Sequence, residues 1–164
     1  LNIVLNIVAA SVIAMNMDVL DQVIALAVFM PIISDMSGCS GNQAVAVSIR
    51  ELALGILKPR DFVRVFFKES SVGVINGLAL GCLIGLVAIL WKGNFWLGIV
   101  VGSALCINTI VAVCFGGLVP LILKKMKVDP ALMSGPMLTT VTDMCGFFLV
   151  LTIASQMMPL LAGV

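Results

Sequence analysis

The chain has 164 residues, of which 62% are hydrophobic and only 10% are charged, and its mean hydropathy is +1.24. A soluble domain is typically about 25% charged, so this composition excludes a soluble globular fold and predicts an all-α membrane protein. The net charge of +1 comes without a basic patch and therefore gives no indication of nucleic-acid binding. Because the chain begins at Leu1, inside an apolar run and without Met, we expect it to be part of a longer protein.

Five transmembrane helices are predicted when the apolar runs are divided at charges and helix breakers. Pro31 is expected to bend the second run, and Pro59 to close it, because proline cannot continue a helix. The pair Asp129-Pro130 is typical of a helix N-cap followed by a first-turn proline. Several runs have about 30 residues, more than the roughly 20 needed to cross the hydrocarbon, so we expect tilted helices. The predicted helices cover about residues 1–17, 19–57, 61–91, 95–126 and 129–161.

Basic residues predict the orientation of the chain in the membrane. Only Lys92 lies on the side of the first and third connections, whereas the second and fourth connections and their flanks are rich in Lys and Arg. By the positive-inside rule, the N-terminus is cytoplasmic and the C-terminus is outside. We therefore expect a multi-pass protein of the cell membrane, either a plasma membrane or a bacterial inner membrane. The residues that set this orientation are Arg50, Lys58, Arg60, Arg64, Lys68, Lys124, Lys125 and Lys127.

Two carboxylates are predicted near the middle of the membrane. Asp35 follows Asp21 by 14 residues and Asp143 follows Pro130 by 13 residues, which places each about 20 Å from a predicted membrane edge. An acid at this depth is costly and indicates a function by default. The structural alternative is a carboxylate paired with a buried Lys or Arg, but no basic residue is predicted at the same depth.

Small and oxygen-bearing residues share one helix face with each of these acids. Close helix packing in lipid accounts for the glycines, but it does not account for the Asp and Asn side chains. Carboxylate, amide and hydroxyl oxygens without nitrogen or sulfur ligands suit a hard cation such as Mg²⁺ or Ca²⁺. At helical spacing, the two stripes are Asp35, Gly38, Asn42 and Ala46 in the second helix, and Gly135, Thr139, Asp143 and Gly146 in the fifth.

An intramembrane enzyme is an alternative interpretation. The segment Gly38-Cys39-Ser40-Gly41 matches the GxSG pattern of rhomboid-type serine proteases, but the chain has no histidine to take the serine proton. Asp143 follows Thr-Val-Thr and not the GxG of intramembrane aspartyl proteases. The five cysteines form no C-x-x-C pair, which favours packing over a zinc or iron–sulfur site. We therefore predict that the chain is not an enzyme.

Two stretches resemble the signature sequences of the MgtE family of magnesium channels and transporters. They are PIISDMSGCSGNQAVAVSIRELALG and GGLVPLILKKMKVDPALMSGPMLTTVTDMCGF. The resemblance covers essentially all of residues 1–164 and implies a five-helix pore domain that forms a homodimer around one pore, lined by the second and fifth helices. It also implies that Mg²⁺ binds at mid-pore to Asp143, and that the pore is lined by Gly38, Asn42, Gly135 and Thr139.

The chain departs from the family pattern at Asp35, where a small residue is common. This additional carboxylate predicts a second cation site. The preference among divalent cations therefore stays open, and we expect Ca²⁺ or Mn²⁺ to bind in place of Mg²⁺. Many members carry cytoplasmic regulatory domains that are missing from this chain. A secondary transporter that exchanges Mg²⁺ for Na⁺ or H⁺, with Asp35 or Asp143 as its coupling carboxylate, remains an alternative. A non-transporting membrane scaffold is a more distant alternative.

Charge balance also favours a homodimer in the lipid bilayer. Each chain offers one fifth-helix carboxylate, which is half the charge of a divalent cation, and a two-fold axis doubles it. We expect the glycine-rich face of the second helix, at Gly38 and Gly41, to allow the close approach of the two subunits.

Overall fold

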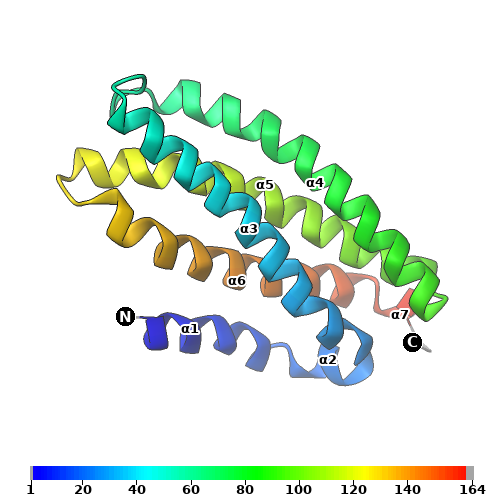
Figure 1. Cartoon of the computed structure of the whole chain (residues 1–164). Helices are drawn as coiled ribbons and strands as arrows, with labels where there is room; N and C mark the ends of the chain where they lie inside the picture. Colours follow the sequence, from blue (N-terminus) through cyan, green and yellow to red (C-terminus); the bar gives the residue numbers. More distant parts are fainter. Residues whose placement is uncertain (1, 162–164) are drawn as a thin grey trace.

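The computed structural model describes residues 2–161, and every regular element in this range is an α-helix (Figure 1). The predicted all-α class is thus confirmed. Leu1, where the first predicted helix begins, lies outside the described residues. The helices are α1 (Asn2–Ala14), α2 (Met17–Gln22), α3 (Ala25–Ala53), α4 (Phe62–Lys92), α5 (Phe95–Lys125), α6 (Pro130–Gln156) and α7 (Met158–Leu161).

The helix ends follow the caps and breakers of the sequence in most places. The Asn94 side chain accepts hydrogen bonds from the first turn of α5, and Asp129 accepts one from Ala131 N at 2.9 Å, as predicted for the start of α6. Helix α4 ends at Gly93, which adopts a left-handed φ of 70°. The predicted start of the second helix was wrong. The helical structure is interrupted at Val23 and Ile24, between α2 and α3, where no Gly or Pro indicates an interruption.

Three helices in the described part of the chain, α4, α5 and α6, are long and apolar enough to cross a membrane. Helix α3 has 29 residues, a length of about 43 Å, but its central polar stretch lowers its hydropathy. Helix α1 has 13 residues and reaches only about 20 Å. The prediction of five membrane-spanning helices is therefore supported for three of them and stays a prediction for α1 and α3.

Helix α5 lies at the centre of the bundle and packs against α3, α4 and α6. Its contact with α4 is close because four glycines, Gly73, Gly77, Gly81 and Gly85, recur at four-residue spacing in the middle of α4. A Cβ atom at Gly77 would lie 2.7 Å from the backbone oxygen of Cys106, and one at Gly81 would lie 2.6 Å from that of Gly102. Small residues thus let the two backbones touch, as they do between helices in lipid.

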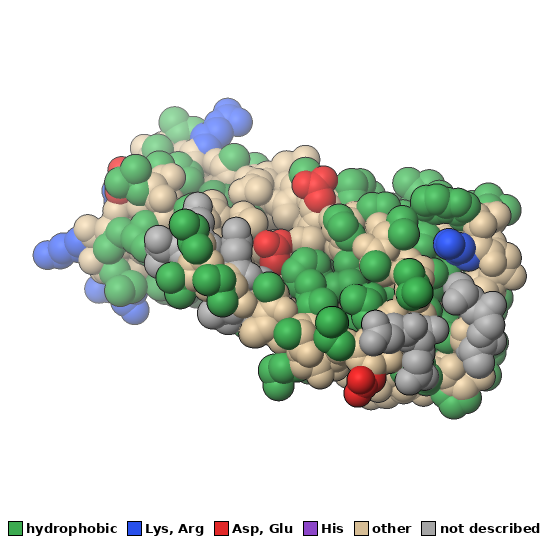
Figure 2. Space-filling view, turned by 90° about the horizontal axis from the view of Figure 1, so that it is seen from below, with side chains coloured by type: hydrophobic (Ala, Val, Ile, Leu, Met, Phe, Trp, Pro, Cys, Tyr) green, Lys and Arg blue, Asp and Glu red, His purple; other side chains and the backbone are tan. Residues whose placement is uncertain are grey.

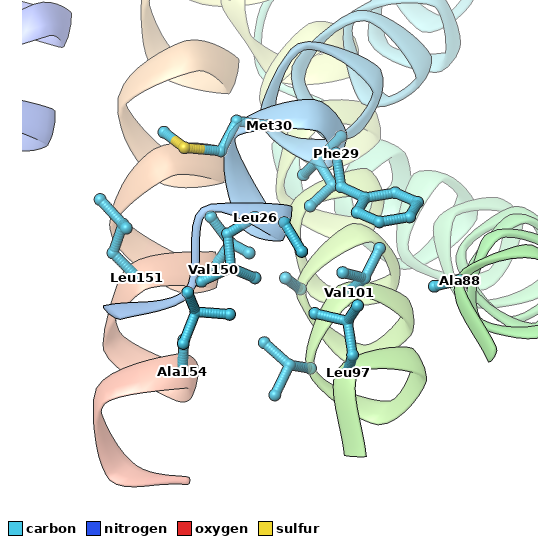
Figure 3. Close-up of a cluster of buried hydrophobic side chains, with 14 of the residues drawn as sticks. Leu26, Phe29, Met30, Ala88, Leu97, Val101, Val150, Leu151 and Ala154 are labelled. Atoms are coloured by element: carbon cyan, nitrogen blue, oxygen red, sulfur yellow. The ribbon is translucent and has the colours of Figure 1, made fainter. Parts of the chain in front are cut away.

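A hydrophobic cluster fixes α3, α5 and α6 to one another at one end of the bundle (Figure 3). Its side chains include Leu26 and Phe29 from α3, Val101 from α5, and Val150 and Leu151 from α6, all at most 1% exposed. The cluster therefore holds α3 and α6 together at this end of the bundle, and both helices carry polar residues further along.

The two Lys- and Arg-rich connections lie at the same end of the bundle. The α3–α4 and α5–α6 connections share this end with the N-terminus, while the α4–α5 connection and the C-terminus lie at the other (Figure 1). Figure 2 likewise shows Lys and Arg side chains mainly toward one end. The two basic connections thus lie at the same end of the bundle, as the positive-inside argument requires. The orientation of the chain in a membrane stays a prediction.

Candidate functional site

A polar pocket of about 360 Å³ lies between α3 and α6, halfway along the bundle. Asp143 is the central residue of α6, with 13 residues before it and 13 after it in the helix. The pocket is lined by Pro31, Ser34, Asp35, Gly38, Cys39 and Asn42 from α3 and by Thr139, Thr142, Asp143 and Phe147 from α6.

The structure brings together five of the six residues that the sequence assigned to a cation site. These are Asp35, Gly38, Asn42, Thr139 and Asp143. Gly135, one turn before Thr139, does not line the pocket; it is half-buried, and a Cβ atom there would meet open space. Helical spacing thus identifies the face of α6 that carries the pocket residues, but it does not show where along that face the pocket ends.

Ser34 holds the central carboxylate. Its hydroxyl donates a hydrogen bond to Asp143 Oδ1, and this bond links α3 to α6 across the pocket. The sequence analysis missed Ser34, although Ser34 precedes Gly38 by one helical turn and therefore lies on the same face of α3. It also missed Thr142, which lines the pocket beside Asp143.

Neither pocket acid has a basic partner. In the part of the chain that the structure describes, the ion pairs are those of Lys68 Nζ, at 2.8 Å from Glu51 Oε1 and 3.7 Å from Glu69 Oε1. Asp35 and Asp143 take part in none. The structural alternative, a carboxylate neutralised by a buried Lys or Arg, therefore finds no partner among these residues.

The oxygens of the pocket suit a cation that keeps its water. Among the described residues, no group of three His, Cys, Asp or Glu side chains is close enough to hold a bare metal ion. The hydroxyls of Thr139 and Thr142 donate to backbone oxygens of their own helix, at 3.1 and 2.9 Å, and the exposed Thr139 hydroxyl keeps lone pairs free to accept from water. Mg²⁺ gives up its water reluctantly, and such a pocket offers second-shell contacts.

The pocket opens onto the surface of the single chain. Asp35, Cys39, Asn42 and Thr139 are exposed, whereas Asp143 is half-buried. Figure 2 shows acidic side chains among hydrophobic ones in the middle of the face seen there, away from the basic end. Polar groups that are exposed among apolar surface are costly where such a surface faces lipid.

The expected role of Gly41 is corrected by the packing within one chain. Gly41 is buried, and a Cβ atom there would lie 2.9 Å from both the Ala112 backbone oxygen on α5 and the Leu138 side chain on α6. Its small size is therefore explained by contacts inside one chain, not by an approach between subunits. Gly38, in contrast, lines the pocket, and its added Cβ would meet only Thr142 Oγ1, at an ordinary 3.7 Å.

Comparison with known proteins gives a consistent family match. The family model described as MgtE, divalent cation transporter, matches residues 30–153. The chain is 39% identical over 151 residues to a magnesium transporter MgtE of Bacillus subtilis, 34% over 154 residues to one of Enterococcus faecalis, and 36% over 152 residues to one of Thermus thermophilus. These alignments cover 92%, 94% and 93% of the chain but 34% of each relative, so the chain spans about a third of the length of the curated relatives it matches.

Proposed function

Because the chain belongs to the MgtE family of divalent cation transporters, we propose that it forms a pore through which hydrated Mg²⁺ crosses the membrane. The family consists of transporters and not of enzymes, in agreement with the sequence-based prediction. The observation that carries the proposal is the pocket between α3 and α6, where Asp35 and Asp143 meet oxygen-bearing side chains and have no ion-pair partner among the described residues. The three relatives are named magnesium transporters, which favours Mg²⁺ as the cargo.

Asp143 is the proposed central binding group. Asp143 lies at the middle of α6 and therefore places a negative charge where an ion that crosses the membrane is furthest from bulk water. Ser34 holds Oδ1 in place, while Oδ2 accepts no hydrogen bond from the described residues and is free to bind a water of the hydrated ion. Contact through water is weak enough for the ion to leave again, as conduction requires.

The proposed working unit is a homodimer with the pore between the subunits. A second copy related by a two-fold axis covers the exposed polar groups Asp35, Asn42 and Thr139 and places a second Asp143 near the first. Two carboxylates then balance the charge of one divalent cation. Without the cation they repel each other, so ion occupancy and the stability of the closed pair are coupled.

A coupled transporter is the second candidate, and the presence of Asp35 favours it. This second acid lines the same pocket without an ion-pair partner among the described residues. In this mechanism Asp35 is the coupling carboxylate. A coupled mechanism needs a Na⁺ or H⁺ gradient, whereas a pore conducts Mg²⁺ down its own gradient.

Reconstitution into liposomes tests the proposal directly. The purified protein is placed in vesicles loaded with a Mg²⁺ indicator, and Mg²⁺ is added outside without any Na⁺ or H⁺ gradient. We expect saturable uptake that Asp143→Asn removes. Uptake only with an imposed Na⁺ or H⁺ gradient would favour the coupled transporter, and no uptake under either condition would contradict transport by this chain alone.

A further inference from the structure

A buried amide lies directly behind the pocket. Asn108, on α5, is 0% exposed and contacts both pocket helices, although α5 contributes no side chain to the pocket lining. Burying an amide inside a membrane-spanning helix is unfavourable unless the amide is hydrogen-bonded. Its partners therefore decide what the residue does.

The amide nitrogen of Asn108 joins α3 to α6. Nδ2 donates to Ser37 Oγ at 2.6 Å and to the backbone oxygen of Thr142 at 3.1 Å. A backbone carbonyl can only accept, so the NH₂ group of the amide must face α6. One side chain on the central helix thus fixes both walls of the pocket at the same level.

Both hydrogen bonds end next to the central carboxylate. On α6, Thr142 is the residue before Asp143. On α3, the Ser37 hydroxyl donates to the Ile33 backbone oxygen at 2.8 Å and also lies 3.0 Å from the Ser34 backbone oxygen, and the Ser34 hydroxyl in turn donates to Asp143 Oδ1. A continuous set of contacts therefore runs from Asn108 through α3 to the carboxylate, with a second route through the α6 backbone.

Stability alone does not explain an amide at this position. Asn108 Oδ1 is buried and accepts no hydrogen bond from the described residues, and such an unsatisfied group is destabilising. A leucine, which has the same number of side-chain heavy atoms and no polar group, would avoid this cost. The packing nevertheless leaves room for the amide, since a Cβ atom at Gly146 would lie 2.8 Å from Asn108 Nδ2. Gly146 was predicted to share the pore stripe of α6, but it is buried against α5 instead.

We propose that Asn108 is a positioning residue for the cation site: its amide fixes the spacing of α3 and α6, and this spacing sets the affinity and selectivity of the pocket for divalent cations. This inference rests on the proposed function of Asp143. It assigns a role in the site to α5, a helix that contributes no residue to the pocket lining.

The test compares Asn108→Leu with Thr109→Val in liposome flux assays. Thr109 is the matched control because it is the next residue on α5, is equally buried, and donates only to Leu105 O of its own helix, at 2.8 Å. For Asn108→Leu we expect the half-saturating Mg²⁺ concentration to rise about five- to tenfold, which corresponds to the net contribution of about one of the two hydrogen bonds that the substitution removes. The preference for Mg²⁺ over Ca²⁺ should fall, with the maximal flux kept within about twofold. Thr109→Val should change neither the half-saturating Mg²⁺ concentration nor the preference for Mg²⁺ over Ca²⁺.

Two further variants keep the test decisive if Asn108→Leu does not fold. Gly146→Ala should push the amide away from Thr142, and Ser37→Ala removes its partner on α3, so both should raise the half-saturating concentration in the same direction. Unchanged half-saturation and selectivity in the folded variants, or a loss of maximal flux alone, would overturn the inference.

Asp143→Asn, measured in parallel, separates this inference from the proposed function. If Asp143→Asn transports Mg²⁺ like the unmodified protein, the proposed site itself is wrong. If Asp143→Asn is inactive while Asn108→Leu behaves like Thr109→Val, only the positioning role of Asn108 is wrong.

Discussion

Ser34 and Asp143 lie 109 residues apart in the chain, and the Ser34 hydroxyl donates a hydrogen bond to the Asp143 carboxylate. This bond connects the first half of α3 with the middle of α6 across the pocket that both residues line. It satisfies one carboxylate oxygen while leaving the negative charge in place. A pocket acid that is held by a neutral donor keeps its attraction for a cation, which a Lys or Arg partner would have cancelled.

The first prediction concerns Asp143. Asp143→Asn keeps the size of the side chain and its bond with Ser34 but removes the charge. We expect saturable Mg²⁺ flux in liposomes to fall at least tenfold, with unchanged helical content and membrane insertion. Flux at the unmodified rate in folded Asp143→Asn would show that the central carboxylate does not bind the transported ion.

The second prediction concerns the hydrogen bond to that carboxylate. Ser34→Ala leaves the charge of Asp143 intact but frees its side chain to rotate. Hydrogen bonds to charged groups contribute about 1.5–3 kcal/mol, so we expect Mg²⁺ half-saturation to rise at least tenfold with the maximal flux nearly unchanged. Ser71→Ala is a suitable control, because the Ser71 hydroxyl is exposed and bonds only to Phe67 O of its own helix. Equal half-saturation in the two variants would argue against a role for Ser34.

The third prediction concerns Asp35. Because Asp35 lines the same pocket and has no ion-pair partner among the described residues, we expect a second divalent cation to bind near it. Crystals soaked in Mn²⁺ should show anomalous density at both acids, and Asp35→Gly should remove the density near position 35 only. Density at Asp143 alone, with selectivity indifferent to Asp35→Gly, would make Asp35 a tolerated wall residue.

The fourth prediction concerns the close contact of α4 with α5. Gly81→Ala places a methyl group 2.6 Å from the backbone oxygen of Gly102, and overpacking of this kind costs about 1–3 kcal/mol. Gly135→Ala is the matched control, since open space surrounds that position. In thermal unfolding of the detergent-solubilised protein, Tm should fall for Gly81→Ala and stay unchanged or rise for Gly135→Ala. An unchanged Tm for Gly81→Ala would mean that the helices can separate at no cost.

The sequence allowed the composition of the pocket to be predicted better than its contacts. Residues that repeat at helical spacing, such as Asp35, Gly38 and Asn42, share a face by geometry alone, and all three line the pocket. The bond between Ser34 and Asp143 depends on how far α3 and α6 rotate and approach, which no spacing within one helix records.

Helical spacing did not indicate the proposed role of α5 in the site. Asn108 stands in an apolar run with no polar residue one turn away on either side, so no stripe singled it out. Gly41 was predicted to allow a close approach, but a glycine does not specify its partner helix. Its neighbours turned out to be Ala112 and Leu138 of the same chain.

The last prediction is that two subunits share one pore. Each single chain exposes Thr139 and Asn42 beside its half-buried Asp143, and polar groups at mid-membrane depth are not stable against lipid. A second copy on a two-fold axis is the smallest cover that also supplies a second carboxylate. On a cysteine-free background, Thr139→Cys should therefore form a disulfide between subunits in native membranes, and Mg²⁺ should change its rate. Leu90→Cys should not cross-link, because Leu90 is 77% exposed on α4, a helix that contributes no residue to the pocket lining. Equal cross-linking of the two variants would indicate random collision, and a transporting monomer in detergent would exclude the shared pore.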